Sequence, residues 1–452
     1  MLQRLAIGLL TAFVLGIALL WLLAGIAPRQ LPSAAGLATG LGAKLACSGT
    51  YLSGFSEQRN ADDLATYSAL TRLLDIRAVA QGGVAASLLG SPDAVARYRP
   101  GLGCALEYAS ASVLDAVAYA APASNADAPW PGGSVVGPAD PEIAAVLSAL
   151  LAADNAQGLD TRALLVVQDG RVIAEAYAPG ISAGTPLLGW SMGKSVTAIM
   201  LGRLEAMGKI AVTEQALFPA WAADERAGIS LENLLQMSSG LAFSEDYVPG
   251  SDSTRMLFMS PSASDVALDS PLAHAPGTVW SYSSGTSNLL ARLVYERVGA
   301  SPQAQLDFIT REISAPLGLE ATTLEPDASG VFVGSSFIYA PARDWARFAW
   351  LLVNGGEING QRLLSEEWIA RAVQPNGSGN EPRYGYQFWL NAGGGELRWP
   401  SLPASAYAMQ GNREQVVMML PSHRAVIVRL GWSTTEYPVD QNFAAIIAAL
   451  RP

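Results

Sequence analysis

The sequence predicts a mixed α/β (α+β) fold in which one antiparallel sheet is flanked by helices and joined to a helical insertion. Two hairpin patterns lie far apart in the chain: residues 163–177, with an Asp169-Gly170 turn, and residues 416–430, with a turn at 421–424. Helical periodicity dominates the stretch between them. One sheet built from both ends of a domain is therefore the most economical architecture.

The composition excludes several classes of protein. The chain of 452 residues is 50% hydrophobic and 15% charged, which allows a large buried core. It has 28 Lys+Arg and 39 Asp+Glu, giving a formal net charge of −11 without a basic block, so we expect no nucleic-acid partner. Two His and two Cys, widely separated, offer no metal-ligand spacing, and we expect neither a metal nor a cofactor.

The N-terminal segment, residues 1–28, reads as a transmembrane anchor. Residues 5–27 carry no charge, and as a helix rising about 1.5 Å per residue they extend roughly 34 Å, enough to cross a bilayer. A cleaved signal peptide is the alternative, because Gly25 and Ala27 are small residues at suitable spacing. The anchor predicts a single-pass protein of the cytoplasmic (inner) membrane with its main domain on the periplasmic side, whereas cleavage predicts a secreted protein.

An extension, residues 29–138, precedes the main domain and carries no catalytic motif. Short helical patterns, such as 62–74, alternate with Gly and Pro, and we expect the extension to pack on the main domain. Cys47 and Cys104 are candidates for one disulfide in an oxidising compartment, and two buried free thiols are the alternative.

The main domain, residues 139–452, begins with an apolar helical pattern over 143–151, just before the first hairpin. Two further helices are predicted at 196–207 and 289–298, each followed by a glycine that ends it. A last apolar helix is predicted over 443–450.

Ser191 lies at the start of the 196–207 helix, where exposed backbone N–H groups favour an adjacent anion. Lys194 is three residues further on, on the same helical face. A serine hydroxyl needs a neighbouring base, and an amine serves as one if burial lowers its pKa. Tyr282, on a loop before the 289–298 helix, is a third candidate, because a nearby cation would lower the pKa of its phenol and let it share the proton.

Three motifs resemble those of one enzyme superfamily. Ser191-Met192-Gly193-Lys194, Tyr282-Ser283-Ser284 and residues 234–241 are similar to the motifs of serine β-lactamases and penicillin-binding proteins, on the class C side. That side also holds β-lactamase-like carboxylesterases and 6-aminohexanoate-dimer hydrolases, and residues 335–348 are most similar to the last branch. The resemblance implies a β-lactamase-like fold and a serine hydrolase that cleaves a small-molecule ester or amide.

The resemblance also assigns roles to residues. It implies that Ser191 is acylated, that Lys194 and Tyr282 form the general base, and that Ser284 stands where class C enzymes carry Asn. The choice among an ester, a linear amide, a D-aminoacyl peptide and a β-lactam stays open, as does the oligomeric state.

The family's third motif would fall at Met409-Gln410-Gly411. Gly411 would then border the substrate, and the backbone N–H of Asn412 would join that of Ser191 in an oxyanion hole. Met409 replaces the family's basic residue, for which Arg413 is a candidate substitute. Glu414 adds a negative charge and argues against anionic substrates.

Two alternatives remain open. Gly189-Trp190-Ser191-Met192-Gly193 also fits the nucleophile elbow of α/β-hydrolases, which would need His274 or His423 as a partner. The chain could instead be a non-catalytic, membrane-tethered penicillin-binding or scaffold protein, because a fold does not guarantee activity.

Overall fold

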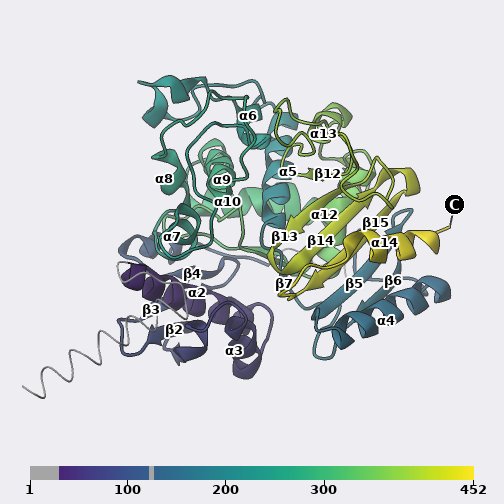
Figure 1. Cartoon of the computed structure of the whole chain (residues 1–452), viewed down its shortest axis with the longest axis horizontal. Coiled ribbons are helices and arrows are strands. Elements are labelled where there is room, and N and C mark those ends of the chain that lie inside the picture. The colour runs from purple at the N-terminus through teal and green to yellow at the C-terminus, as the bar shows by residue number, and fades with distance from the viewer. Residues whose placement is uncertain (1–29, 122–126, 452) are drawn as a thin grey trace, which may run out of the picture.

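The computed structural model describes residues 30–121 and 127–451. Figure 1 shows a large body with a smaller, purple N-terminal part attached to it beside α7. A six-stranded sheet in the large body has the order β12-β13-β14-β15-β5-β6, and all neighbouring strands are antiparallel. Its strands are β5 (Thr161–Gln168), β6 (Arg171–Tyr177), β12 (Trp389–Leu390), β13 (Tyr407–Gly411), β14 (Gln415–Leu420) and β15 (Ala425–Gly431). The predicted sheet, built from both ends of the domain, is confirmed.

Both faces of this sheet are covered by helices. Along β5, Leu164 and Val166 pack with α4 (Pro141–Ala156) and α14 (Val439–Ala448), whereas Leu165 and Val167 join the larger core that contains α12 (Ala342–Val353). Because strand side chains alternate between faces, a strand buried on both sides is apolar throughout. The turn between β5 and β6 has positive φ at both of its central residues, Asp169 and Gly170, as a tight hairpin requires.

The helical insertion lies between β6 and β12. It contains α5 (Met192–Ala206), α6 (Leu231–Leu235), α7 (Asp252–Phe258), α8 (Ala263–Leu268), α9 (Ser284–Val298), α10 (Pro302–Phe308), α11 (Ala315–Leu317) and α13 (Glu366–Ala372) besides α12. Two small sheets accompany them: β7 (Leu187–Leu188), β8 (Thr323–Leu324) and β9 (Ile338–Ala340) form one, and β10 (Glu357–Ile358) and β11 (Gln361–Arg362) the other. Serine side chains at the N-caps of α7, α8, α9 and α10 accept backbone hydrogen bonds and so fix where these helices start.

The extension is a helix on a sheet. Helix α2 (Leu31–Tyr51) packs on a four-stranded antiparallel sheet, and α3 (Glu57–Ala65) follows α2. The strands are β1 (Leu74–Val79), β2 (Gly83–Leu88), β3 (Ala94–Arg99) and β4 (Gly103–Leu106). The predicted helix over 62–74 is wrong, because α3 ends at Ala65. In the last turn of α3, the Leu64 carbonyl accepts a hydrogen bond from the Thr71 hydroxyl at 2.7 Å. This side chain takes the place of the backbone N–H that a continuing helix would supply.

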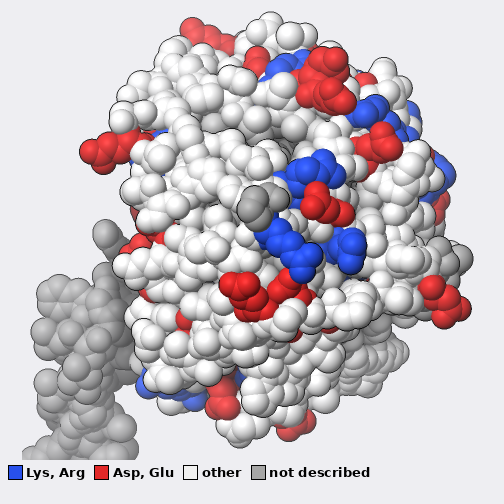
Figure 2. Space-filling model, turned by 90° about the vertical axis from the view of Figure 1, so that its right-hand side faces the viewer, with Lys and Arg blue, Asp and Glu red and all other residues white. Residues whose placement is uncertain are grey.

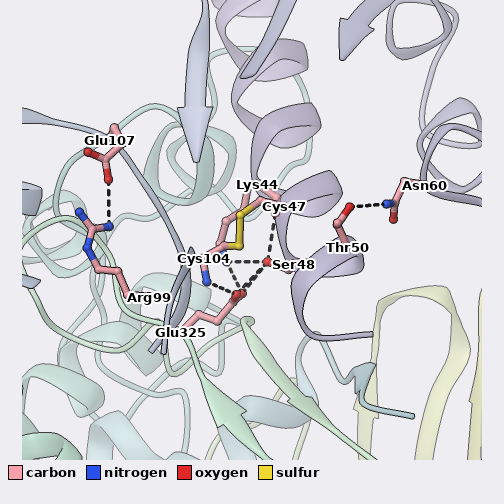
Figure 3. Close-up of a disulfide and its surroundings, with 9 residues drawn as sticks. All are labelled: Lys44, Cys47, Ser48, Thr50, Asn60, Arg99, Cys104, Glu107 and Glu325. Atoms are coloured by element: carbon pink, nitrogen blue, oxygen red, sulfur yellow. Dashed lines mark hydrogen bonds and ion pairs between the residues drawn. A yellow bond between two sulfur atoms is a disulfide. The ribbon is translucent and has the colours of Figure 1, made fainter. Parts of the chain in front are cut away.

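A buried polar cluster joins the extension to the main domain (Figure 3). Glu325, which follows β8, accepts hydrogen bonds from the Cys104 N–H at 2.6 Å and the Ser48 hydroxyl at 2.8 Å, and forms an ion pair with Lys44. A disulfide between Cys47 and Cys104 ties α2 to β4 beside this cluster. We call Lys44, Ser48, Cys104 and Glu325 the docking cluster.

The predicted anchor, residues 5–27, lies outside the described residues. Within residues 30–121 and 127–451, no helix combines the length and apolar character needed to span a bilayer. On the face shown in Figure 2, acidic and basic side chains are interspersed over a mostly uncharged surface, so this face offers no broad basic patch.

Candidate active site

Ser191 is the N-cap residue of α5 and lines an open cavity of about 290 Å³. The preceding residue, Trp190, has a φ of 48°, so the chain turns sharply before the helix starts. Gly411 of β13 lies against this turn: a Cβ atom there would be 2.1 Å from the Gly189 carbonyl oxygen and 3.2 Å from the Ser191 nitrogen. Only glycine therefore lets the strand approach the start of the helix this closely.

Lys194 contacts the Ser191 hydroxyl. Its Nζ is 3.1 Å from Ser191 Oγ, 2.9 Å from Ser284 Oγ and 3.2 Å from the Ser335 carbonyl oxygen. The side chain is only 1% exposed, and burial lowers the pKa of Lys194 to about 8, while the negative charge of Glu245 acts in the opposite direction. A substantial fraction of the amine is thus neutral near physiological pH, as a general base requires.

Tyr282 completes this group. Its ring lies under the Nζ atom of Lys194, at 4.8 Å from the ring centroid, and Tyr282 lines the same cavity as Ser191. Burial raises the pKa of Tyr282, whereas the neighbouring Ser191 side chain acts in the opposite direction. The expectation that the neighbouring cation lowers this pKa is wrong, because burial of the phenol and the negative charge of Glu245 raise it. The resting phenol is therefore protonated, and Lys194 is the group that titrates near neutrality.

Sequence reasoning missed two residues of this site, Glu245 and Tyr247. The Glu245 carboxylate accepts the Ser284 N–H at 2.7 Å and the Ser284 hydroxyl at 2.5 Å, and the Tyr247 hydroxyl donates to it at 2.9 Å. Glu245 thereby holds Ser284 against the Lys194 amine. Both residues lie on an irregular loop before α7, where no periodicity or motif distinguishes them from surface residues.

The cavity above Ser191 gathers residues from three parts of the chain. It is lined by Ser191, Tyr247, Tyr282, Trp389, Gln410, Gly411, Asn412, Glu414, Gln415 and Val416. Asn412 directly follows Gly411 and lines the same cavity as Ser191. Trp389 stacks on the Tyr282 ring at 5.4 Å between centroids and so holds the phenol in place.

The residues at and after the third motif behave differently from one another. Met409 is completely buried in the core. The Arg413 guanidinium stacks on the Tyr67 ring at 4.0 Å, and it is not among the described residues that line the cavity, so it does not replace the missing basic residue. Glu414 does line the cavity, and its carboxylate accepts the Tyr437 N–H at 3.2 Å.

The α/β-hydrolase interpretation is wrong. Neither histidine is among the described residues that line the Ser191 cavity, and His423 lies in the turn between β14 and β15. The strand before Ser191, β7, is a two-residue strand paired antiparallel with β9, whereas a nucleophile elbow follows a strand of the main sheet.

Comparison with known proteins places this geometry in a family. Residues 143–450 match the family model described as Beta-lactamase. A 6-aminohexanoate-dimer hydrolase of Paenarthrobacter ureafaciens is 26% identical over 250 residues, which cover 51% of this chain and 62% of that protein. The chain thus spans less than two thirds of the length of this relative.

Solved structures show the same fold. A Bacillus anthracis protein, provisionally described as a 6-aminohexanoate-dimer hydrolase, superposes with a TM-score of 0.56 at 20% identity and covers 72% of this chain and 88% of its own. A family VIII carboxylesterase superposes with a TM-score of 0.52 at 15% identity over 70% of this chain and 98% of its own. The predicted resemblance is confirmed, and the chain belongs to the Beta-lactamase family of serine hydrolases.

Proposed function

We propose that this protein cleaves an ester or amide bond through an acyl-enzyme on Ser191, with Lys194 and Tyr282 moving the protons. The observation that carries the proposal is the contact of a completely buried lysine, whose pKa is lowered to about 8, with the hydroxyl of a serine at a helix N-terminus. The names of the relatives, a 6-aminohexanoate-dimer hydrolase and a carboxylesterase, support the same bond types.

The geometry supports a two-step acyl transfer. The neutral Lys194 amine accepts the Ser191 proton, directly or through the Tyr282 phenol, while Ser191 Oγ bonds to the carbonyl carbon. The backbone N–H groups of Ser191 and Asn412 stabilise the tetrahedral oxyanion. When the intermediate collapses, the bond to the leaving group breaks and the leaving group takes the proton. Water then attacks the acyl-enzyme, releases the acid and restores the Ser191 hydroxyl.

The charge of the residues that line the cavity limits the kinds of substrate that we expect. Met409 provides no cation, and the Arg413 guanidinium stacks on Tyr67. Among the described residues that line the cavity, Glu414 alone carries a charge. We therefore propose a neutral ester or linear amide in preference to a β-lactam, whose carboxylate would meet a negative charge.

The test is the intact mass of the full-length protein after exposure to a phosphonate ester that carries an activated leaving group. We expect one adduct on the wild type, none on Ser191→Ala, and much slower labelling of Lys194→Ala. Ser195→Ala, four residues along the same helix, is the matched control and should label normally. A folded wild-type protein that forms no adduct would favour the non-catalytic scaffold interpretation.

We also propose that residues 5–27 anchor the enzyme in the cytoplasmic membrane, with the main domain on the exported side. The Cys47–Cys104 disulfide supports export, because such bonds persist in oxidising compartments. The test is membrane fractionation of the full chain with an alkaline wash, followed by protease treatment of spheroplasts. Recovery in the soluble fraction at full length would contradict the anchor, and recovery in truncated form would support the signal peptide.

A further inference from the structure

A second cavity, of about 530 Å³, lies between the extension and the main domain. Helix α2 contributes Ala34, Leu37, Ala38 and Leu41. The segment after α3 contributes Tyr67, Ser68, Ala69, Leu70, Thr71 and Leu73. The main domain closes the other side with Trp190, Tyr247, Pro249, Thr254, Phe258 and Asn412. Its volume falls in the range of about 300–1,000 Å³ that is typical of small-molecule sites.

This cavity adjoins the catalytic one. Tyr247 and Asn412 line both cavities, and Trp190, which lines the second, directly precedes Ser191. A substrate held at Ser191 with its carbonyl oxygen near Asn412 therefore lies next to the second cavity, so a long chain on that substrate can extend into it.

The lining of the second cavity is apolar. None of the described residues that line it carries a charge, and most are Ala, Leu, Pro or aromatic. Two of its polar side chains are satisfied within the protein, since Thr71 donates to the Leu64 carbonyl at 2.7 Å and Thr254 to the Val248 carbonyl at 2.9 Å. Most of such a surface is poorly solvated, so it favours an alkyl chain over water.

Resting on the function proposed above, we propose that the substrate is an ester or amide with a long apolar chain, and that this chain occupies the cavity between α2 and Trp190. The extension is then half of the substrate site. This assignment accounts for the docking cluster, which buries charged groups to fix α2 against the main domain.

The first experiment compares p-nitrophenyl acetate, butyrate, octanoate and dodecanoate as substrates of the full-length enzyme, together with alkyl acetates of matching chain lengths. We expect kcat/KM to rise along at least one series, by up to about fourfold for each CH₂ that becomes buried. Flat profiles in both series, with acetate esters turned over normally, would overturn this proposal and leave the proposed function intact.

The second experiment fills the cavity. Ala38→Phe and Ala34→Phe place a ring where the chain is expected, and Ala35→Phe adds the same ring at a half-buried position of α2 that does not line the cavity. We expect the ratio of kcat/KM for dodecanoate to kcat/KM for acetate to fall at least tenfold in the first two variants and to stay at the wild-type value in Ala35→Phe. An unchanged profile in a folded Ala38→Phe protein would contradict the proposal.

A third measurement separates chain binding from chemistry. Ser191→Ala cannot form the acyl-enzyme, so its affinity for dodecanoate and acetate esters can be compared directly by calorimetry. Tighter binding of the long-chain ester, abolished by adding Ala38→Phe, supports the apolar site even if turnover proves undetectable. Equal affinity for both esters would reject the site.

Discussion

Two buried lysines serve opposite purposes in this protein. Lys44 in the docking cluster and Lys194 in the active site are 2% and 1% exposed, whereas the third lysine, Lys209, is exposed. Lys44 forms a direct ion pair with the Glu325 carboxylate. Among the described residues, Lys194 forms hydrogen bonds only with neutral oxygens, and the carboxylate of Glu245 is reached through Ser284.

The difference shows what a lysine needs to become a base. Burial alone lowers the pKa of both amines, and in the docking cluster the Glu325 charge opposes that change directly. A carboxylate in contact keeps the amine paired and structural, whereas a carboxylate one hydroxyl away leaves it free to exchange a proton with Ser191. Identical residues with similar burial therefore differ in role because of the distance to one negative charge.

The largest expected effect is the loss of activity when Lys194 is replaced. Lys194→Met should lower kcat/KM for an acetate ester by about 10²- to 10⁴-fold, the contribution of a general base, with a small change in stability. The measurement is steady-state kinetics beside thermal denaturation, with Lys209→Met as the control. A Lys194→Met enzyme that keeps a tenth of the wild-type kcat/KM would show that Lys194 is not the general base and so does not differ from Lys44 in this way.

Lys44→Met should have the opposite pattern, with a large loss of stability and little change in activity. Removing one partner of a buried ion pair costs about 3–5 kcal/mol, because the Glu325 carboxylate is left buried and unpaired. Denaturant unfolding measures this loss, and the folded fraction should still hydrolyse acetate esters. The double variant Lys44→Met/Glu325→Gln should recover part of the loss, because the glutamine carbonyl still accepts the Cys104 N–H. If the double variant were less stable than Lys44→Met, the Glu325 carboxylate would stabilise the protein even without its lysine partner, which would contradict this explanation.

The disulfide should have a smaller effect on the same region. Cys47→Ala/Cys104→Ala removes a bond between residues 57 apart, and we expect a loss of about 2–4 kcal/mol in denaturant unfolding. Acetate-ester kinetics should change little, because no atom of the bond lies at the Ser191 cavity. Loss of acetate turnover in the folded double variant would show that the extension shapes the catalytic residues themselves.

The contrast between the two lysines also marks the reach of sequence reasoning. Lys194 could be assigned a role because its partner Ser191 lies three residues away, and a helix places such residues together. Lys44 could not, because its partner lies 281 residues further along the chain. Glu245 escaped for the same reason: it meets Ser284 across 39 residues from a loop that has no periodicity.

The fold divides in a similar way. The hairpins of the main sheet were predictable because their strands are long, apolar and joined by a recognisable turn. The sheet of the extension was not predicted, since β1 to β4 contain many alanines and arginines, which favour strands only weakly. Its packing depends on α2 and on main-domain residues distant in sequence, such as Glu325 and Leu306.

The smallest predicted effect is a shift in the pH dependence of activity. It tests whether the Glu245 charge, which is separated from Lys194 by the Ser284 hydroxyl, still changes the pKa of that amine. Hydrolysis requires the neutral amine, so kcat/KM of the wild type should rise as pH increases through about 8. The Glu245 charge stabilises the protonated amine and raises its pKa, so Glu245→Gln should move this limb to lower pH. The glutamine oxygen can still accept the Ser284 N–H, and the amide NH2 group can donate to the Ser284 hydroxyl oxygen in place of the second carboxylate oxygen. Glu232→Gln is the matched control, because Glu232 also accepts a tyrosine hydroxyl, that of Tyr386. A limb that stays in place in Glu245→Gln would mean that burial alone sets the pKa of the base and that Glu245 only positions Ser284.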